Sequence, residues 1–210
     1  MKSWQKKLIH IVQPFFKKIE SVHGIDHAEK VIKNAQIIAK DFPNADADVL
    51  FAASYLHDVG YVNLKNGTGY HGHHSVDWVE KLSKEQGFPK EKVILIKQIV
   101  RLHDKQKLKG KLPLEVLIFH DADKLEAIGA IGLARNFAFS GSIGRRIWEP
   151  KIKRKPHLPY GGNISAMHTI LDWEMKKEFY TKKGKEIAKG RRDFMQAFVK
   201  RFFEEWNYKK

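Results

Sequence analysis

The chain has 210 residues, of which 42% are hydrophobic, and its formal net charge at pH 7 is +15. This hydrophobic content excludes a disordered chain, and the length predicts one domain, 1–210, with a sizeable core. The lack of cysteine excludes disulfides, a thiolate nucleophile and a cysteine-type zinc site. No apolar run approaches the roughly 20 residues of a membrane span, and no secretory signal is evident, so we expect a cytoplasmic protein with anionic partners.

Apolar residues recur at intervals of three and four along most of the chain, and no stretch shows the alternation typical of a strand. In chain order this spacing predicts helices over residues 4–21, 26–42, a stretch that ends at 57, 74–86, 89–103, 113–139, 164–180 and 184–206. Asn44 and Asp46 are candidate caps of the third helix, and the glycines within 60–72 predict a turn. We expect an all-α fold, a compact helical bundle with a covering helix within 1–21 and C-terminal helices within 164–210.

Histidines and aspartates fall on the apolar faces of three of these helices. His27 and Asp123 each share a face with apolar residues three or four positions away, and His57-Asp58 closes an apolar helix just before Gly60. An unpaired carboxylate on such a face would cost several kcal/mol, so a compensating partner is expected. We predict a metal site between the core helices, with His27, His57, Asp58 and Asp123 as ligands.

Each of these histidines taken alone is also consistent with a buried ring that pairs with a backbone carbonyl. The His-Asp dipeptide occurs twice more, at His103-Asp104 and at His120-Asp121. The order along the chain and the glycine after His57-Asp58 favour that pair as the metal-binding one.

The order His27, His57-Asp58, Asp123 resembles that of the HD superfamily of metal-dependent phosphohydrolases. The stretches 121–135 and 184–195 are similar to a bacterial subgroup of small, stand-alone HD hydrolases, and the resemblance covers about 21–206. It implies an enzyme that hydrolyses phosphoester or phosphoanhydride bonds in nucleotides, as a nucleotide pyrophosphatase or phosphatase, with a metal-activated water. The segment 164–180 departs from the subgroup's pattern.

Further histidines raise the question of a second metal ion. His103 lies on the apolar side of 89–103, and His73 and His74 stand at the start of 74–86. With His74 and His103 included, the order resembles binuclear HD proteins, in which the middle aspartate bridges two ions. In the alternative interpretation these histidines face the substrate and donate to its phosphates. Under either interpretation Asp58, His74 and His103 are the candidate catalytic residues, and Asp58 orients the attacking water.

A mixed set of nitrogen and oxygen ligands leaves positions on a six-coordinate ion for water and a phosphate oxygen. It favours manganese, iron, nickel, cobalt or zinc over magnesium, which prefers oxygen and water. The sequence does not choose among these metals, nor does it identify the nucleotide or the oligomeric state.

Positive charge gathers between residues 140 and 163, where prolines and glycines predict a long basic loop. Arg145 and Arg146 lie in this loop and, with Lys124, Arg135 and His73, are candidates for contacts with substrate phosphates. Lys124 falls on a different helical face from Asp123 and is equally consistent with a surface charge. The expected partner is a small phosphorylated anion, because the chain shows no helix-turn-helix or aromatic RNA-binding motif.

Two other functions remain open at this point. One is a mixed-valent di-iron oxygenase, which some HD proteins with the six-ligand order resemble. The other is a non-catalytic binder of nucleotides or nucleic acid that uses the basic surface of the chain.

Overall fold

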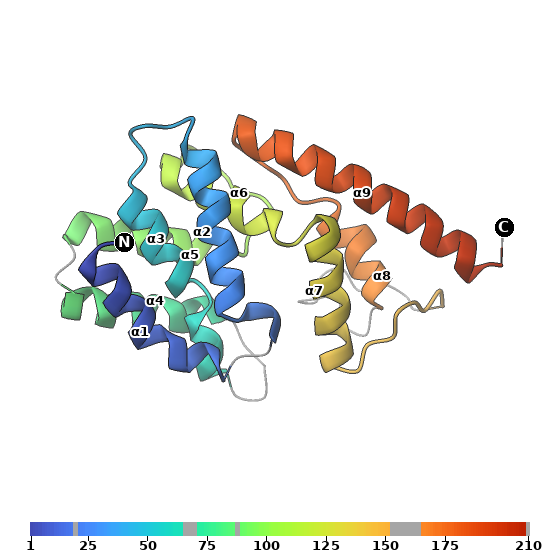
Figure 1. Cartoon of the computed structure of the whole chain (residues 1–210), viewed down its shortest axis with the longest axis horizontal. Helices are drawn as coiled ribbons and strands as arrows, with labels where there is room; N and C mark the ends of the chain where they lie inside the picture. Colours follow the sequence, from blue (N-terminus) through green and yellow to red (C-terminus); the bar gives the residue numbers. More distant parts are fainter. Residues whose placement is uncertain (19–20, 65–70, 87–88, 152–164, 209–210) are drawn as a thin grey trace. The chain divides into compact units, whose positions relative to one another are not determined.

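The computed structural model describes residues 1–18, 21–64, 71–86, 89–151 and 165–208, and in these ranges it contains helices and loops but no strand (Figure 1). The all-α fold is confirmed. The chain divides into two compact units, Met1–Asp123 and Lys124–Lys210. Each unit is described by itself, and a single domain over 1–210 stays a prediction.

The first unit is built around one short apolar helix. Its elements in chain order are α1 (Ser3–Phe16), η1 (Ser21–His23), α2 (Ile25–Ala39), α3 (Ala47–Leu56), η2 (Val59–Asn63), α4 (His71–Gln86), α5 (Lys90–Leu102) and α6 (Leu114–Leu125), the last of which continues into the second unit. Every residue of α3 from Val49 to Leu56 is buried, and α1, α2 and α5 pack around it. Because α3 is apolar on all sides, the residues that follow it emerge inside the unit.

The start of α3 confirms one of the predicted caps. The side chain of Asp46 accepts hydrogen bonds from the backbone N–H groups of Asp48 and Val49, at 2.9 and 3.1 Å. These donors would otherwise lack a partner in the first turn of the helix. The cap fixes where α3 begins, and the helix ends at Leu56, directly before His57 and Asp58.

The fourth helix begins earlier than its apolar pattern predicted. It starts at His71 rather than at residue 74, and its first turn lies against Gly60. A Cβ atom at Gly60 would lie only 2.3 Å from the carbonyl oxygen of His71 and 2.5 Å from the backbone nitrogen of Ser75. The Gly60 N–H also donates to Ser75 Oγ at 2.9 Å. Gly60 is therefore needed for close contact between η2 and α4, beyond its predicted role in ending a helix.

The prediction of one helix over 113–139 is wrong, because the chain breaks between α6 and α7 (Gly129–Ser142). Gly129 has a φ of +79°, which is a conformation that favours glycine. A Cβ atom on Gly132 would lie 2.3 Å from the backbone of Ala127, so this glycine permits the tight bend. The apolar period continues across the break, which is why it predicted a continuous helix. As a result Ala130 and Ala134 are exposed and do not extend the face of Asp123.

The second unit contains α7, α8 (Ala166–Thr169), the π-helical turn η5 (Ile170–Glu174) and α9 (Lys182–Trp206). A regular helix over 164–180 was predicted wrongly. Met175 N–H donates to the carbonyl of Ile170, and the carbonyl of Lys177 accepts from Arg192 of α9. The first bond spans five residues rather than four, and the second connects the end of the segment to another helix, so this segment is not a regular α-helix.

The basic loop was predicted over 140–163, but residues 140–142 still belong to α7; residues 143–151 are not helical, in agreement with the prediction. Lys153, Arg154, Lys155 and His157 lie outside the described residues. Among the helices that the structure describes, none combines the length and the apolar character needed to cross a membrane.

Candidate metal centre

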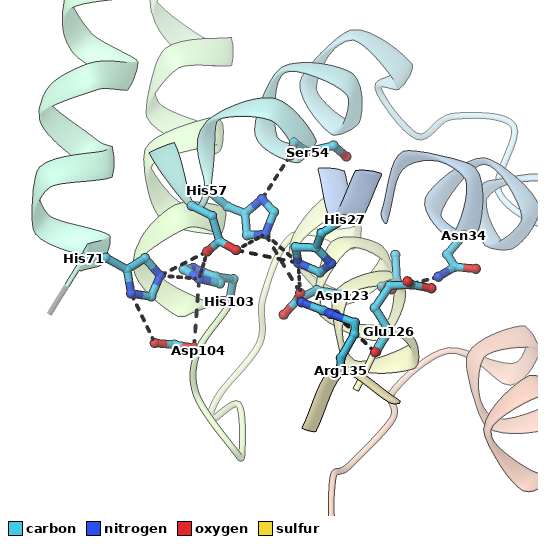
Figure 2. A network of polar contacts seen from close by, with 12 residues as sticks. His27, Asn34, Ser54, His57, His71, His103, Asp104, Asp123, Glu126 and Arg135 are labelled. Carbon is cyan, nitrogen blue, oxygen red and sulfur yellow. Dashed lines mark hydrogen bonds and ion pairs between the residues drawn. The ribbon is translucent and has the colours of Figure 1, made fainter. Parts of the chain in front are cut away.

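Six buried side chains of the first unit form two adjoining groups, each with ligand atoms within 4.8 Å of one another. The first group consists of His27, His57 and Asp123, and the second consists of Asp58, His71 and His103. Each of the six residues is at most 9% exposed. Figure 2 shows the four imidazoles turned toward one another from α2, the end of α3, the start of α4 and the end of α5.

The first group contains three of the four predicted metal ligands. The Nε2 atom of His27 lies 3.3 Å from Nε2 of His57 and 3.4 Å from Oδ1 of Asp123. The Nε2 atom of His57 lies 3.9 Å from the same Asp123 oxygen. Three side chains that are about 30 to 96 residues apart in sequence therefore converge on one point, as the helical faces predicted.

Asp58, the fourth predicted ligand, lies between the two groups. Its Oδ2 atom is 3.2 Å from Nε2 of His57 and 3.6 Å from Nε2 of His27. Its Oδ1 atom is 3.2 Å from Nε2 of His71 and 3.4 Å from Nε2 of His103. One carboxylate thus directs one oxygen to each group, which is the geometry that a bridging ligand requires.

His57 and His103 are oriented by the same kind of local hydrogen bond. Each follows the last residue of its helix, and each donates from Nδ1 to the carbonyl three residues earlier, His57 to Ser54 at 3.0 Å and His103 to Val100 at 2.7 Å. Carbonyls in the last turn of a helix lack intrahelical partners, so these bonds form without disturbing the helix. Because a carbonyl only accepts, the hydrogen sits on Nδ1 and the lone pair of Nε2 points into the cluster.

These orientations create a set of donor atoms that suits a cation. The Nε2 atoms of His71 and His103 are 3.0 Å apart, and those of His27 and His57 are 3.3 Å apart. Where both Nε2 atoms of a pair carry lone pairs, these repel at such distances, whereas a divalent cation between them would attract both. The donor set therefore fits the metal that the sequence predicted.

The charges of the cluster also favour a cation. Burial lowers the pKa of the His57 imidazole, but the carboxylates of Asp58 and Asp123 outweigh it and raise the pKa above its usual range. Burial raises the pKa of the Asp58 carboxyl, but the surrounding imidazoles, foremost His57, lower it well below its usual range. Asp58 is thus ionised, and its negative charge is available to a positive ion.

His71 was missed in the sequence, where His74 was named instead. His74 is half-buried and belongs to neither group, and His73 is exposed. The buried face of α4 passes through Ser75 and Val79 at steps of four. Extending this step backwards by one turn reaches His71, but the signal identifies it only once the structure shows that α4 begins there.

The two other His-Asp pairs, His103-Asp104 and His120-Asp121, differ in whether they contribute to the two groups. His103 belongs to the second group, as the two-ion interpretation expected. His120 is buried, and its Nε2 lies 2.8 Å from the carbonyl of Lys105. His120 and the buried Asp121 belong to neither group, so His120 is an example of a buried histidine that pairs with a backbone carbonyl.

The basic residues that were predicted to contact substrate belong to the second unit. Lys124 is only 5% exposed, so its interpretation as a surface charge is wrong. Arg135 is half-buried and donates to the carbonyl of Glu126 at 3.1 Å. Arg145 is half-buried and Arg146 is exposed. The contacts of these residues with a substrate stay predictions.

Comparison with known proteins shows which family contains this arrangement of side chains. The HD domain family matches residues 24–128, a range that contains all six side chains of the two groups. The chain is 30% identical to the Bacillus subtilis protein YpgQ over 193 residues, which cover 90% of this chain and 87% of YpgQ.

Solved structures share the fold over nearly the whole chain. A Lactobacillus plantarum protein is 26% identical, with a TM-score of 0.82 and 99% of both chains covered. An HD-superfamily hydrolase from Bacillus thuringiensis is 26% identical, with a TM-score of 0.66 and 97% of this chain and 96% of that chain covered. YpgQ was solved in complex with ADP, and that structure gives a TM-score of 0.72 at 23% identity, with 96% of this chain and 94% of YpgQ covered.

Proposed function

Because this chain belongs to the HD domain family and is a metal-dependent hydrolase, we propose that it cleaves phosphoester or phosphoanhydride bonds in nucleotides. The observation that carries the proposal is the placement of Asp58, which directs one oxygen to each of two histidine groups. A centre of this kind suits phosphoryl chemistry, in which both the attacking and the leaving oxygen need stabilisation.

The two groups would hold two ions. His27, His57 and Asp123 would bind the first with Oδ2 of Asp58, and His71 and His103 would bind the second with Oδ1. When bound, divalent cations lower the pKa of a coordinated water and neutralise charge on phosphoryl oxygens. Imidazole-rich ligands favour manganese, iron, cobalt, nickel or zinc over magnesium.

The residues of the chain have distinct tasks in this reaction. The Asp58 carboxylate orients the attacking water by accepting one of its hydrogens. The hydrogen bonds that His57 and His103 donate to helix carbonyls keep their Nε2 lone pairs directed at the centre. Burial of all six side chains limits the access of bulk water, which strengthens each electrostatic contact with the phosphate.

Two observations support a nucleotide as the substrate. The relative YpgQ was crystallised with ADP. The formal net charge of +15 attracts anions to the surface of this chain. We therefore propose a small phosphorylated anion, and foremost a nucleotide, as the ligand of the centre.

A substrate screen tests this function. Metal-free protein is incubated separately with Mn²⁺, Fe²⁺, Co²⁺, Ni²⁺ and Mg²⁺ and with nucleoside mono-, di- and triphosphates, while phosphate and pyrophosphate release are measured separately. We expect turnover with a transition metal and almost none in Asp58→Ala. Pyrophosphate release would identify attack at the α-phosphorus, and phosphate release from monophosphates would identify a nucleotidase. Absence of both products with every metal and nucleotide would refute the proposal.

A further inference from the structure

His71 is held in the cluster by different contacts from those that orient His57 and His103. Those two rings donate from Nδ1 to carbonyls of their own helices. In Figure 2 a dashed line joins His71 to Asp104 instead, and the distance from Nδ1 of His71 to Oδ2 of Asp104 is 3.9 Å. The ring of His71 also stacks on Tyr61. The two ring centres are 4.0 Å apart with an angle of 10° between the planes.

Tyr61 is itself fixed on both sides. Its second face stacks on His23 at 4.4 Å and 19°, and the ring of His23 meets the ring of His27 nearly at right angles, at 6.2 Å. A row of rings thus connects His27 in the first group with His71 in the second. The backbone of Tyr61 follows Gly60, whose contact with α4 holds η2 against the turn that carries His71. The plane of the His71 ring is therefore set by a neighbour that is rigid.

Asp104 lies at the more open side of the second group. It follows His103 directly, and its side chain is 36% exposed, whereas that of His71 is 3% exposed. Its Oδ1 atom lies 4.0 Å from Nε2 of His103. A carboxylate near Nδ1 of an imidazole favours the form with hydrogen on Nδ1, which leaves the lone pair of Nε2 for a metal. In His71 that Nε2 atom is the one that lies 3.2 Å from Asp58.

We infer that Tyr61 and Asp104 are positioning residues for the second ion, Tyr61 by fixing the ring plane of His71 and Asp104 by fixing its tautomer. The inference rests on the proposed two-ion centre. It assigns a role to two residues outside both groups of ligands.

The test measures ion stoichiometry and affinity, using Mn²⁺ and the full-length protein. Removing a partner that orients a metal-bound histidine typically weakens metal binding about 10- to 100-fold. Tyr61→Leu and Asp104→Ala should therefore weaken the second ion by about this factor and leave the first unchanged. Tyr61→Phe keeps the stacked ring and should behave as wild type. Asp77→Ala is the matched control, because it removes an exposed carboxylate from α4, the helix that begins with His71.

Asp104→Asn separates positioning from direct ligation. Its amide oxygen can take the place of the carboxylate oxygen beside Nδ1 of His71, so Asp104→Asn should recover most of the affinity for the second ion, whereas a lost direct ligand would leave Asn and Ala equally weak. Equal losses in Asn and Ala would overturn the positioning role of Asp104. Circular dichroism checks that each variant folds. If Tyr61→Leu does not fold, the two Asp104 variants still test the inference, because the Asp104 side chain is 36% exposed and its substitution does not disturb the core.

The outcomes also separate this inference from the proposed function. Two ions of unchanged affinity in Tyr61→Leu and Asp104→Ala would overturn the inference while wild-type hydrolysis still supports the function. A single ion in the wild-type protein would overturn the inference together with the two-ion centre. Nucleotide hydrolysis is measured on the same wild-type sample, so its result is read independently of the ion count.

Discussion

Asp58 contributes most to the centre at the scale of single residues. Its two carboxylate oxygens serve different groups, so no other residue can replace both contacts at once. Its pKa lies well below the usual range because neighbouring imidazoles outweigh the effect of burial. The carboxylate is therefore ionised at neutral pH, and a buried negative charge of this kind needs a positive partner.

His71 and His74 provide a matched pair of variants for the two-ion centre. His71→Ala should lower the metal content from two ions per chain to one, because the second group loses one of its two imidazoles. His74→Ala, on the same helix but outside both groups, should leave the content at the wild-type value. Elemental analysis after dialysis measures the ratio. A lower content in His74→Ala with a normal content in His71→Ala would contradict the assignment.

Helix ends supply the centre at the scale of secondary-structure elements. His57 and His103 each follow the final residue of a helix, and His71 begins one. At the two C-terminal positions the backbone has carbonyl groups that His57 and His103 use, so these two rings are oriented at no cost in helical hydrogen bonds. The contact of Gly60 with the first turn of α4 then sets how closely His71 approaches Asp58.

Substituting Gly60 tests this link between packing and the centre. In Gly60→Ala the added methyl group would meet the His71 carbonyl oxygen at 2.3 Å, so the first turn of α4 must move away. We expect weaker binding of the second ion, lower hydrolysis and a loss of stability of about 1–3 kcal/mol, which is usual for overpacking. Gly141→Ala is the control, because nothing lies within 4 Å of a Cβ atom at that position. Urea denaturation and metal titration measure the two effects, and unchanged ion affinity would contradict this role of Gly60.

At the scale of the whole molecule, the candidate metal ligands and the basic residues that were predicted to contact phosphate fall in different units. All six candidate ligands lie in Met1–Asp123, whereas Lys124, Arg135, Arg145 and Arg146 lie in Lys124–Lys210. The high net charge would attract an anionic substrate over a distance of about one Debye length, roughly 10 Å at moderate ionic strength. Specific contacts between the basic segment and a phosphate tail would add to this general attraction.

Charge neutralisation distinguishes the specific contacts from the general field. Changing Arg145, Arg146 and Arg154 together to Gln should raise KM more for triphosphates than for monophosphates and should weaken its salt dependence. The control changes three exposed lysines of the first unit to Gln, namely Lys6, Lys7 and Lys33, and removes the same number of charges. Steady-state kinetics at several salt concentrations provide the comparison. Equal effects of the two triple variants would show that only the overall charge matters.

Much of the fold and the centre could be predicted from local patterns. The helical periods of α2, α3, α5 and α9 are confirmed, as is the cap at Asp46. The structure brings His27, His57, Asp58 and Asp123 together as their apolar faces predicted. These features depend on residues three or four positions apart, and such spacing is visible in a single sequence.

The features that were predicted wrongly depend on backbone conformation and on contacts that apolar spacing does not reveal. A periodic pattern continued through 113–139, but Gly129 takes a positive φ there. Periodicity also continued through 164–180, where Ile170–Glu174 form a π-helical turn and the carbonyl of Lys177 accepts a bond from Arg192 of α9. Local spacing contains no information about such partners, so it cannot predict where they interrupt a helix.

The sequence by itself determined an all-α chain, with an imidazole and carboxylate set in the order of a metal-dependent hydrolase. Only the tertiary structure decided which of three neighbouring histidines joins the centre. His71, His73 and His74 have the same chemistry and nearly the same place in the sequence, but α4 starts at His71 and packs that turn against Gly60. This close contact between segments that are distant in sequence places His71, rather than His74, beside Asp58.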